Sequence, residues 1–113
     1  MPEPLIPTGR ILRIDLDNGD PESILKSLAS SPRLKILKLL SDQVLNVSEI
    51  GEALDLPTST ATLHVITLES VGLINTELRP ATRGLQKVCA RAYDVIVVEL
   101  SRGDLGQEKS VEV

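Results

Sequence analysis

The order of helices and strands is decided by residues 46–72, which read NVSEIGEALDLPTSTATLHVITLESVG. Asn46 and Glu49 have the spacing of a capping box, which predicts a short helix over residues 47–54. An Asp-Leu-Pro turn follows. Apolar residues at i, i+4 and i+7 then predict a second helix, which Gly72 ends in the left-handed conformation common after helices. This stretch therefore predicts two helices joined by a tight turn.

The residues before this unit predict one strand and two more helices. Residues 10–17 alternate apolar and charged side chains, which is typical of a half-buried strand. Asp20 followed by Pro21 predicts the start of a helix that runs to about Ser30. Ser31-Pro32 predicts another helix start by the same logic. The dense apolar content of that helix places it near the centre of the core.

After Gly72 the hydrophobic period changes from that of a helix to that of a strand. Residues 73–78 predict one strand, residues 80–84 a hairpin loop, and residues 85–100 a second, long extended stretch. In the latter half of this stretch, residues 95–98 are all Val or Ile, so we expect them to be buried on both faces.

A short helix, a tight turn, a second helix and a β-hairpin together form a helix-turn-helix with a wing. We therefore predict an α+β fold, mainly α: a winged helix-turn-helix with a β-hairpin wing and an extra N-terminal strand. A chain of 113 residues has room for one domain. We place this domain at residues 10–100, between a flexible arm at 1–9 and a disordered tail at 101–113.

The composition fits a globular protein and excludes several function classes. Hydrophobic residues make up 42% of the chain and charged residues 25%. With one Tyr, no Phe and no Trp, the chain cannot build the aromatic platforms of single-strand binders. The sequence shows neither a secretion signal nor an apolar run near the roughly 20 residues of a membrane span. A single cysteine cannot form an internal disulfide, so we expect a cytoplasmic protein without membrane contacts.

Motifs along roughly residues 24–93 follow one another in a recognisable order. They are LASSPRLKIL at 28–37, VSEIGEALDL at 47–56 and, in the second helix and the turn after it, Ser59-Thr60, His64, Leu68-Glu69 and Gly72-Leu73. This order, without a gap, resembles the arsenical-resistance-repressor (ArsR-type) family of winged-helix regulators. The resemblance implies a transcriptional regulator of the repressor type that binds a palindromic operator in double-stranded DNA as a homodimer.

The second helix of the motif is the expected reader of DNA. A helix fits the major groove, where each base pair presents a distinct pattern of donors and acceptors. Short hydroxyls bond to phosphates or base edges. Leu63 and Ile66 stand where the family usually has basic or polar residues, which shifts readout toward thymine methyl groups. The predicted recognition residues are Thr58, Ser59, Thr60, Thr62, Leu63, His64 and Thr67.

Basic residues flank the motif instead of lying within it. No Lys or Arg occurs between Leu39 and Leu78, and no acid occurs between Arg79 and Arg91. The net charge of −4 argues against general coating of nucleic acid, but local charge decides site-specific binding. We therefore expect the wing to neutralise most of the phosphates. The predicted wing contacts are Arg79, Arg83, Lys87 and Arg91.

Each of these interpretations has a simpler alternative. The hydroxyls can form a solvated face with Thr58 or Ser59 as helix cap, and the basic residues can guard the hairpin edge against aggregation. Leu63 and Ile66 can complete the core or a dimer contact, and if exposed they mark a partner surface. The alternative function is then a winged-helix module for protein–protein interaction that has lost DNA binding.

The remaining reactive residues do not indicate a metal site or a catalytic site. His64 is the only histidine, and residues 45–49 lack the paired cysteines of the metal-sensing members of the resembled family. We therefore expect no metal and no other cofactor, and the effector is unknown. No nucleophile–base pair or phosphate loop is apparent, so we do not expect an enzyme. Cys89 has cations on its strand face, but we interpret it as an inert packing residue.

A homodimer is also suggested by the strands themselves. Residues 10–17 and 93–100 need partners that a two-stranded wing does not supply. The two segments can pair with one another either within one chain or between two chains, and the sequence leaves this choice open.

Overall fold

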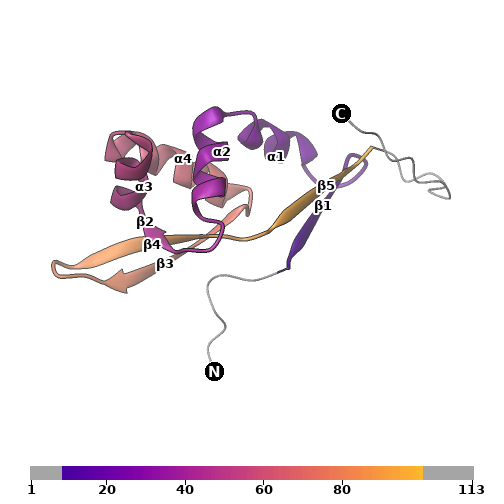
Figure 1. Ribbon diagram of the computed structural model, residues 1–113. Helices are drawn as coiled ribbons and strands as arrows, with labels where there is room; N and C mark the ends of the chain where they lie inside the picture. The colour runs from indigo at the N-terminus through magenta and orange to yellow at the C-terminus, as the bar shows by residue number, and fades with distance from the viewer. Residues whose placement is uncertain (1–8, 101–113) are drawn as a thin grey trace, which may run out of the picture.

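The computed structural model describes residues 9–100; apart from Gly9, the predicted arm at 1–9 and tail at 101–113 lie outside the described residues. Figure 1 shows the helices above the hairpin, with a second, smaller sheet at the end away from the hairpin tip. The fold is a winged helix-turn-helix with an added N-terminal strand, as predicted. Its elements are β1 (Ile11–Asp15), α1 (Pro21–Leu28), α2 (Ser31–Leu39), β2 (Leu45–Asn46), α3 (Val47–Leu54), α4 (Thr58–Ser70), β3 (Ile74–Pro80), β4 (Leu85–Arg91) and β5 (Val95–Glu99).

Two helix starts follow the predicted caps. The Asp20 carboxylate accepts the backbone N–H of Ser23 at 3.2 Å and so caps α1. At α3 the capping box is complete. The Asn46 side chain accepts the Glu49 N–H at 2.8 Å, and the Glu49 carboxylate accepts the Asn46 N–H at 2.9 Å. Both bonds satisfy N–H groups that have no partner inside a helix.

Two other helix starts differ from the prediction. α2 is capped by Ser30 and not by Ser31, because the extended backbone of Ser30 aims its hydroxyl at the N–H three residues ahead. α4 begins after Pro57 without any side-chain cap. The alternative in which Thr58 or Ser59 caps this helix is therefore wrong.

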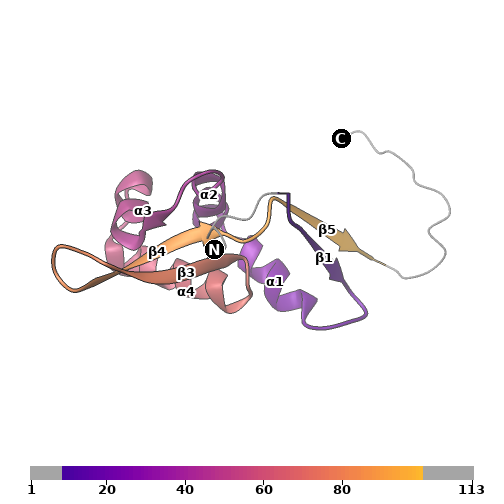
Figure 2. The same ribbon diagram turned by 90° about the horizontal axis from the view of Figure 1, so that it is seen from below.

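The strands form two separate sheets. β2, β4 and β3 form an antiparallel sheet in that order, and β1 pairs with β5 in parallel, with Ile11 beside Val95. The single extended stretch predicted over 85–100 is wrong, because the chain leaves the wing after β4. The backbone N–H of Asp94 then donates to the Arg10 carbonyl at 2.9 Å, which starts the pairing with β1. Figure 2 shows the two sheets apart, and the N-terminal strand has its partner within its own chain.

The burial predicted for residues 95–98 is also wrong. Val95 and Val98 expose 48% and 39% of their surface. Val95 lies beside Ile11 on the face opposite the buried Ile14, so it stays in contact with solvent, whereas Val98 is exposed beside Ile14 near the end of β5.

The core is aliphatic and lies between the helices and the base of the hairpin. Cys89 on β4 is fully buried in it, and this burial raises the pKa of the thiol to about 11. Cys89 is thus a protonated packing residue, as expected. The largest fully buried side chains around it are Ile36, Leu40, Ile50, Val65, Leu68, Leu73 and Ile74.

Candidate nucleic-acid interface

The turn between α3 and α4 is fixed by close backbone contacts. The backbone N–H of Leu56 donates to the Gly51 carbonyl at 2.8 Å. A Cβ atom at Gly51 would lie 2.8 Å from the Leu56 carbonyl oxygen, which is closer than real side chains approach. Asp55 reverses the chain in the left-handed conformation, with φ at 55°. The absence of a side chain at Gly51 therefore sets how closely the turn packs on α3.

α4 buries one face and exposes the other. Ala61, Val65 and Leu68 are fully buried at the predicted spacing. Leu63 and Ile66, on the other face, expose 66% and 49% of their surface. The alternative in which these two complete the core is wrong, and nothing within residues 9–100 buries them.

The hydroxyls along α4 are partly committed to the helix itself. The Thr62 hydroxyl donates to the Thr58 carbonyl at 2.8 Å, and the Thr67 hydroxyl donates to the Leu63 carbonyl at 3.1 Å. A hydroxyl has one proton but two acceptor lone pairs. While these bonds persist, Thr62 and Thr67 can accept hydrogen bonds from a ligand but cannot donate to one.

The first turn of α4 is open. The first bond of the helix runs from the Ala61 N–H to the Pro57 carbonyl at 3.0 Å, and no side chain caps this end. The N–H groups of residues 58–60 therefore have no helical acceptor and lie at the positive end of the helix dipole. The hydroxyls of Ser59 and Thr60 form no hydrogen bond with the described part of the chain. This end of α4 has the chemistry of a phosphate site.

His64 connects α4 to the rest of the protein. Its Nδ1 lies 3.2 Å from the Nη1 of Arg33, whose Nε donates to the Ser27 carbonyl at 2.6 Å. Partial burial, and then the Arg33 charge, lower the pKa of His64. A neutral imidazole that accepts at Nδ1 carries its proton on Nε2. The role of Arg33 leaves no pattern in the sequence, because this cation binds backbone carbonyls that only the fold brings near it.

Two of the predicted wing cations lie toward the outer end of the hairpin, and we call Arg79 and Arg83 the outer wing. Arg83 is exposed in the loop that the Ala81 N–H closes onto the Gly84 carbonyl at 2.9 Å. Arg79, on β3, lies 3.5 Å from Glu77 in an exposed ion pair. Such a pair is weak in water, so Arg79 can exchange it for a phosphate.

The other two cations, Lys87 and Arg91, have partners in the body of the protein, and we call them the wing base. Lys87 Nζ lies 2.9 Å from a carboxylate oxygen of Glu69, at the end of α4. Glu69 also accepts the hydroxyl of Thr76 on β3, and these two bonds lower the pKa of its carboxyl group. Glu69 therefore joins α4 to both strands of the hairpin.

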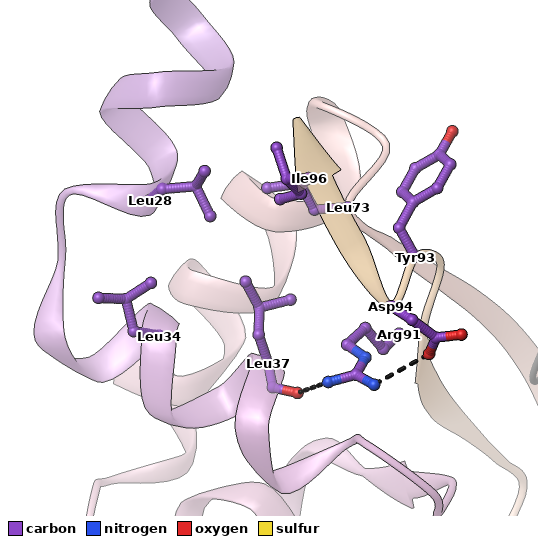
Figure 3. Close-up of a pocket in the computed structure, with 8 residues that line it drawn as sticks. All are labelled: Leu28, Leu34, Leu37, Leu73, Arg91, Tyr93, Asp94 and Ile96. Atoms are coloured by element: carbon purple, nitrogen blue, oxygen red, sulfur yellow. Dashed lines mark hydrogen bonds and ion pairs between the residues drawn. The ribbon is translucent and has the colours of Figure 1, made fainter. Parts of the chain in front are cut away.

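Arg91 holds the wing base to α2. Its guanidinium donates to the Leu37 carbonyl at 3.4 Å and to the Ser41 carbonyl at 3.5 Å, and it forms an ion pair with Asp94 at 3.0 Å. Figure 3 shows the contacts with Leu37 and Asp94 at the edge of an apolar hollow. Arg91 is only 22% exposed, so its charge lies largely within the protein.

The structure thus brings the predicted α4 residues onto one helix but divides the predicted wing residues into two places. Thr58, Ser59 and Leu63 are exposed, whereas Thr60, Thr62, His64 and Thr67 are half-buried. Within residues 9–100, no group of three or more His, Cys, Asp or Glu side chains is placed to hold a metal ion. In the same range no helix has both the length and the apolar character to span a bilayer.

Comparisons with known proteins agree with this architecture. The profile of the bacterial arsR regulatory protein family matches residues 30–76. HlyU from Vibrio cholerae, in its reduced form, is 31% identical over 62% of this chain and 70% of its own, with a TM-score of 0.55. A search of curated proteins gave no match.

Two structures of one Mycobacterium bovis protein are also similar to this chain. The crystal structure of its fragment 1–100, a possible transcriptional regulatory protein, is 30% identical over 62% of this chain and 71% of its own, with a TM-score of 0.55. The solution structure is also 30% identical, with a TM-score of 0.55, over 62% of this chain and 61% of its own. It is described as a homodimeric winged helix-turn-helix DNA-binding domain of a possible ArsR-family regulator. The chain presented here belongs to the ArsR family and is a DNA-binding transcriptional regulator of the winged helix-turn-helix type.

Proposed function

We propose that this protein binds a palindromic operator in double-stranded DNA as a homodimer and represses transcription from it. The observation that carries the proposal is the uncovered outer face of α4, which begins with an uncapped first turn. A recognition helix needs such a face, because side chains covered by the protein cannot reach base edges in the major groove.

The chemistry along α4 assigns a role to each predicted residue. The N–H groups of the first turn, with Ser59 and Thr60, bind a phosphate. Thr62 and Thr67 accept hydrogen bonds from the amino groups of adenine or cytosine, because their own protons are in use. Leu63 contacts thymine methyl groups.

The cations and His64 complete the interface. Arg79 and Arg83 of the outer wing neutralise phosphates beside the groove. The wing base, which was also predicted to contact DNA, sets the position of the hairpin through Glu69 and α2. The Nε2 of His64 donates a hydrogen bond to the DNA, while its Nδ1 accepts a hydrogen bond from Arg33.

The proposed activity needs no catalytic group, metal or cofactor. Recognition by α4 and the outer wing is binding alone, so we propose a non-enzymatic regulator. Because an operator lies on the chromosome, we place the protein in the cytoplasm and expect no membrane contact.

Selection of bound DNA from a random pool tests this function. The expected product is a palindrome with half-sites about one helical turn apart, bound more weakly as salt rises. Recovery of no preferred sequence, together with salt-independent binding, would contradict the proposal.

A second candidate function, a protein-interaction module, is favoured by one observation. Leu63 and Ile66 form an exposed apolar pair on a helix without Lys or Arg. The double variant Leu63→Ser/Ile66→Ser distinguishes the two functions. A DNA reader changes its sequence preference at A·T positions, whereas an interaction module binds no duplex before or after the change.

A further inference from the structure

An apolar hollow of about 300 Å³ lies between α1, α2 and β5. Leu73 forms its buried side and is 2% exposed, whereas Leu34 at its rim is 50% exposed. Figure 3 shows the side chains of Leu28, Leu37 and Ile96 around the same space. A mostly apolar hollow with a few polar groups at one edge is typical of sites for small molecules.

The size and the lining of the hollow limit the kind of ligand. A closed apolar cavity of about 150 Å³ holds a benzene ring, so a hollow of about 300 Å³ has room for an apolar body of roughly ten carbons. Most of the lining is leucine and isoleucine. A large polar ligand such as a nucleotide would lose its hydration there without gaining hydrogen bonds.

The polar edge of the hollow is formed by Arg91 and Asp94 (Figure 3). Asp94 already accepts the Gly9 N–H at 2.5 Å and the Arg91 guanidinium at 3.0 Å. The bonds from Arg91 to the Leu37 and Ser41 carbonyls, at 3.4 and 3.5 Å, are longer than most N–H···O bonds. A carboxylate accepts from a guanidinium more strongly than a neutral carbonyl does, so it can replace these two partners.

The charges beside the hollow also favour an anion. A second cation, Arg10, has its guanidinium carbon 5.1 Å from the centre of the Tyr93 ring, and Tyr93 lines the hollow. Arg10 and Arg91 thus lie near a single acid, Asp94, which already has two hydrogen-bond donors. This surplus of positive charge attracts a carboxylate and repels an amine.

We propose that the hollow binds a small monocarboxylate with an apolar aliphatic or aromatic body, and that this ligand releases the protein from DNA. The release rests on the proposed function. The ligand takes Arg91 from the Leu37 and Ser41 carbonyls, and these bonds hold the wing base to α2. Their loss loosens the hairpin that carries the outer wing. The carboxylate therefore binds the free protein more tightly than the DNA-bound protein.

Naphthalene-2-carboxylate is a suitable probe, because it joins an apolar double ring to a single carboxylate. Its fluorescence can be followed with little background, since the chain has no Trp and one Tyr. Titration of the full chain should show saturable binding. Naphthalene-2-carboxamide, which has the same shape without the charge, should bind roughly tenfold more weakly. Equal binding of the acid and the amide would overturn the pairing of the carboxylate with Arg91.

A change at the rim of the hollow tests the location of the site. Leu34→Glu should weaken naphthalene-2-carboxylate binding by roughly tenfold or more, because the new acid repels the ligand. The matched control is Leu25→Glu on α1, where the side chain is 37% exposed and does not line the hollow. The control should bind as the wild type does, and circular dichroism should show that both variants keep their helices. Equal weakening in the two variants would overturn the assignment.

Methyl NMR of the unmodified protein gives a second test of location that needs no variant. The methyl signals of Leu28, Leu37 and Ile96 should shift on addition of naphthalene-2-carboxylate. An absence of shifts at these methyls would overturn the site. Signals that change with protein concentration and not with the ligand would also overturn it, because they would place a second copy of the chain in the hollow.

Titration with operator DNA separates the ligand site from the DNA function. Saturating naphthalene-2-carboxylate should lower operator affinity by roughly fivefold or more, with an equal concentration of sodium chloride as the control for ionic strength. The Leu34→Glu variant should not respond. Unchanged operator affinity with the ligand bound would overturn the release. Ligand binding in the hollow of a protein that binds no duplex would support the site and contradict the proposed function.

Discussion

The outer wing and the wing base carry the same number of cations within thirteen residues of sequence, yet they differ in what those cations contact. Arg83 is exposed, and Arg79 has only a weak exposed pair. Lys87 and Arg91 instead bind Glu69, Asp94 and backbone carbonyls. A basic stretch that contains no acid can therefore hold both free and committed charges, because partners such as Glu69 and the Leu37 carbonyl come from other segments of the chain.

The largest expected effect concerns the outer wing. The double variant Arg79→Ala/Arg83→Ala should lose about tenfold or more in operator affinity. The log–log salt slope should become less steep by about 4, because each of the two copies on the operator loses two phosphate contacts. Fluorescence anisotropy over roughly 50–200 mM salt measures both quantities. The distinction between the outer wing and the wing base would be wrong if this variant kept the wild-type salt slope while Lys87→Ala and Arg91→Ala each made the slope less steep.

Arg91→Ala should affect stability more than it affects the salt slope. The change removes one bond to the Leu37 carbonyl of α2, one bond to the Ser41 carbonyl just after α2, and the packing of the side-chain stem. The free energy of unfolding should therefore fall by about 1–2 kcal/mol. Urea unfolding measures this loss, with Arg83→Ala as the matched control that should leave it unchanged. Equal stability of the two variants would show that Arg91 does not hold the wing to α2.

A smaller effect is expected at Lys87. The pair with Glu69 is about one-third exposed on each side, so solvent screens it, and a double-mutant cycle should give a coupling energy of about 0.5 kcal/mol. The cycle uses Lys87→Met and Glu69→Gln, measured by urea unfolding at low and high salt. A coupling that does not weaken at high salt would contradict an ion pair accessible to solvent.

The smallest effect is a pH dependence from His64. Because the pKa of the folded imidazole is lowered from 6.5, the unfolded chain takes up the proton first as the pH falls. Stability from this group is complete above about pH 6.5 and is lost below it, until the folded group also protonates. His64→Gln should therefore reduce the difference between urea midpoints at about pH 7.5 and about pH 5.5. If the difference between the two urea midpoints is the same in this variant as in the wild type, His64 is not the source of the pH dependence.

Local patterns predicted the presence and order of the four helices and of the hairpin wing. The capping box at Asn46 and the spacing of Ala61, Val65 and Leu68 depend on residues at most seven positions apart, so a single sequence contains them. The break between β4 and β5 was missed because it depends on pairing with β1, more than eighty residues earlier. A long extended stretch does not show which strand each part of it will join.

The residues of the candidate site were likewise predictable where local patterns decide them, but not where distant contacts do. The α4 residues follow from helical periodicity and from the family resemblance. The division of the wing cations depends on contacts such as that between Lys87 and Glu69, which only the fold creates. The role of Arg33 beside His64 depends in the same way on the approach of α2 to α4.

The most direct test of α4 and the outer wing as the DNA-binding surface is an NMR titration of the full chain with the selected duplex. Amide shifts should be largest at residues 58–67 and in the hairpin loop at 81–84, with little change at residues 95–99. Shifts confined to β1 and β5, or no shifts at saturating duplex, would contradict this placement of DNA.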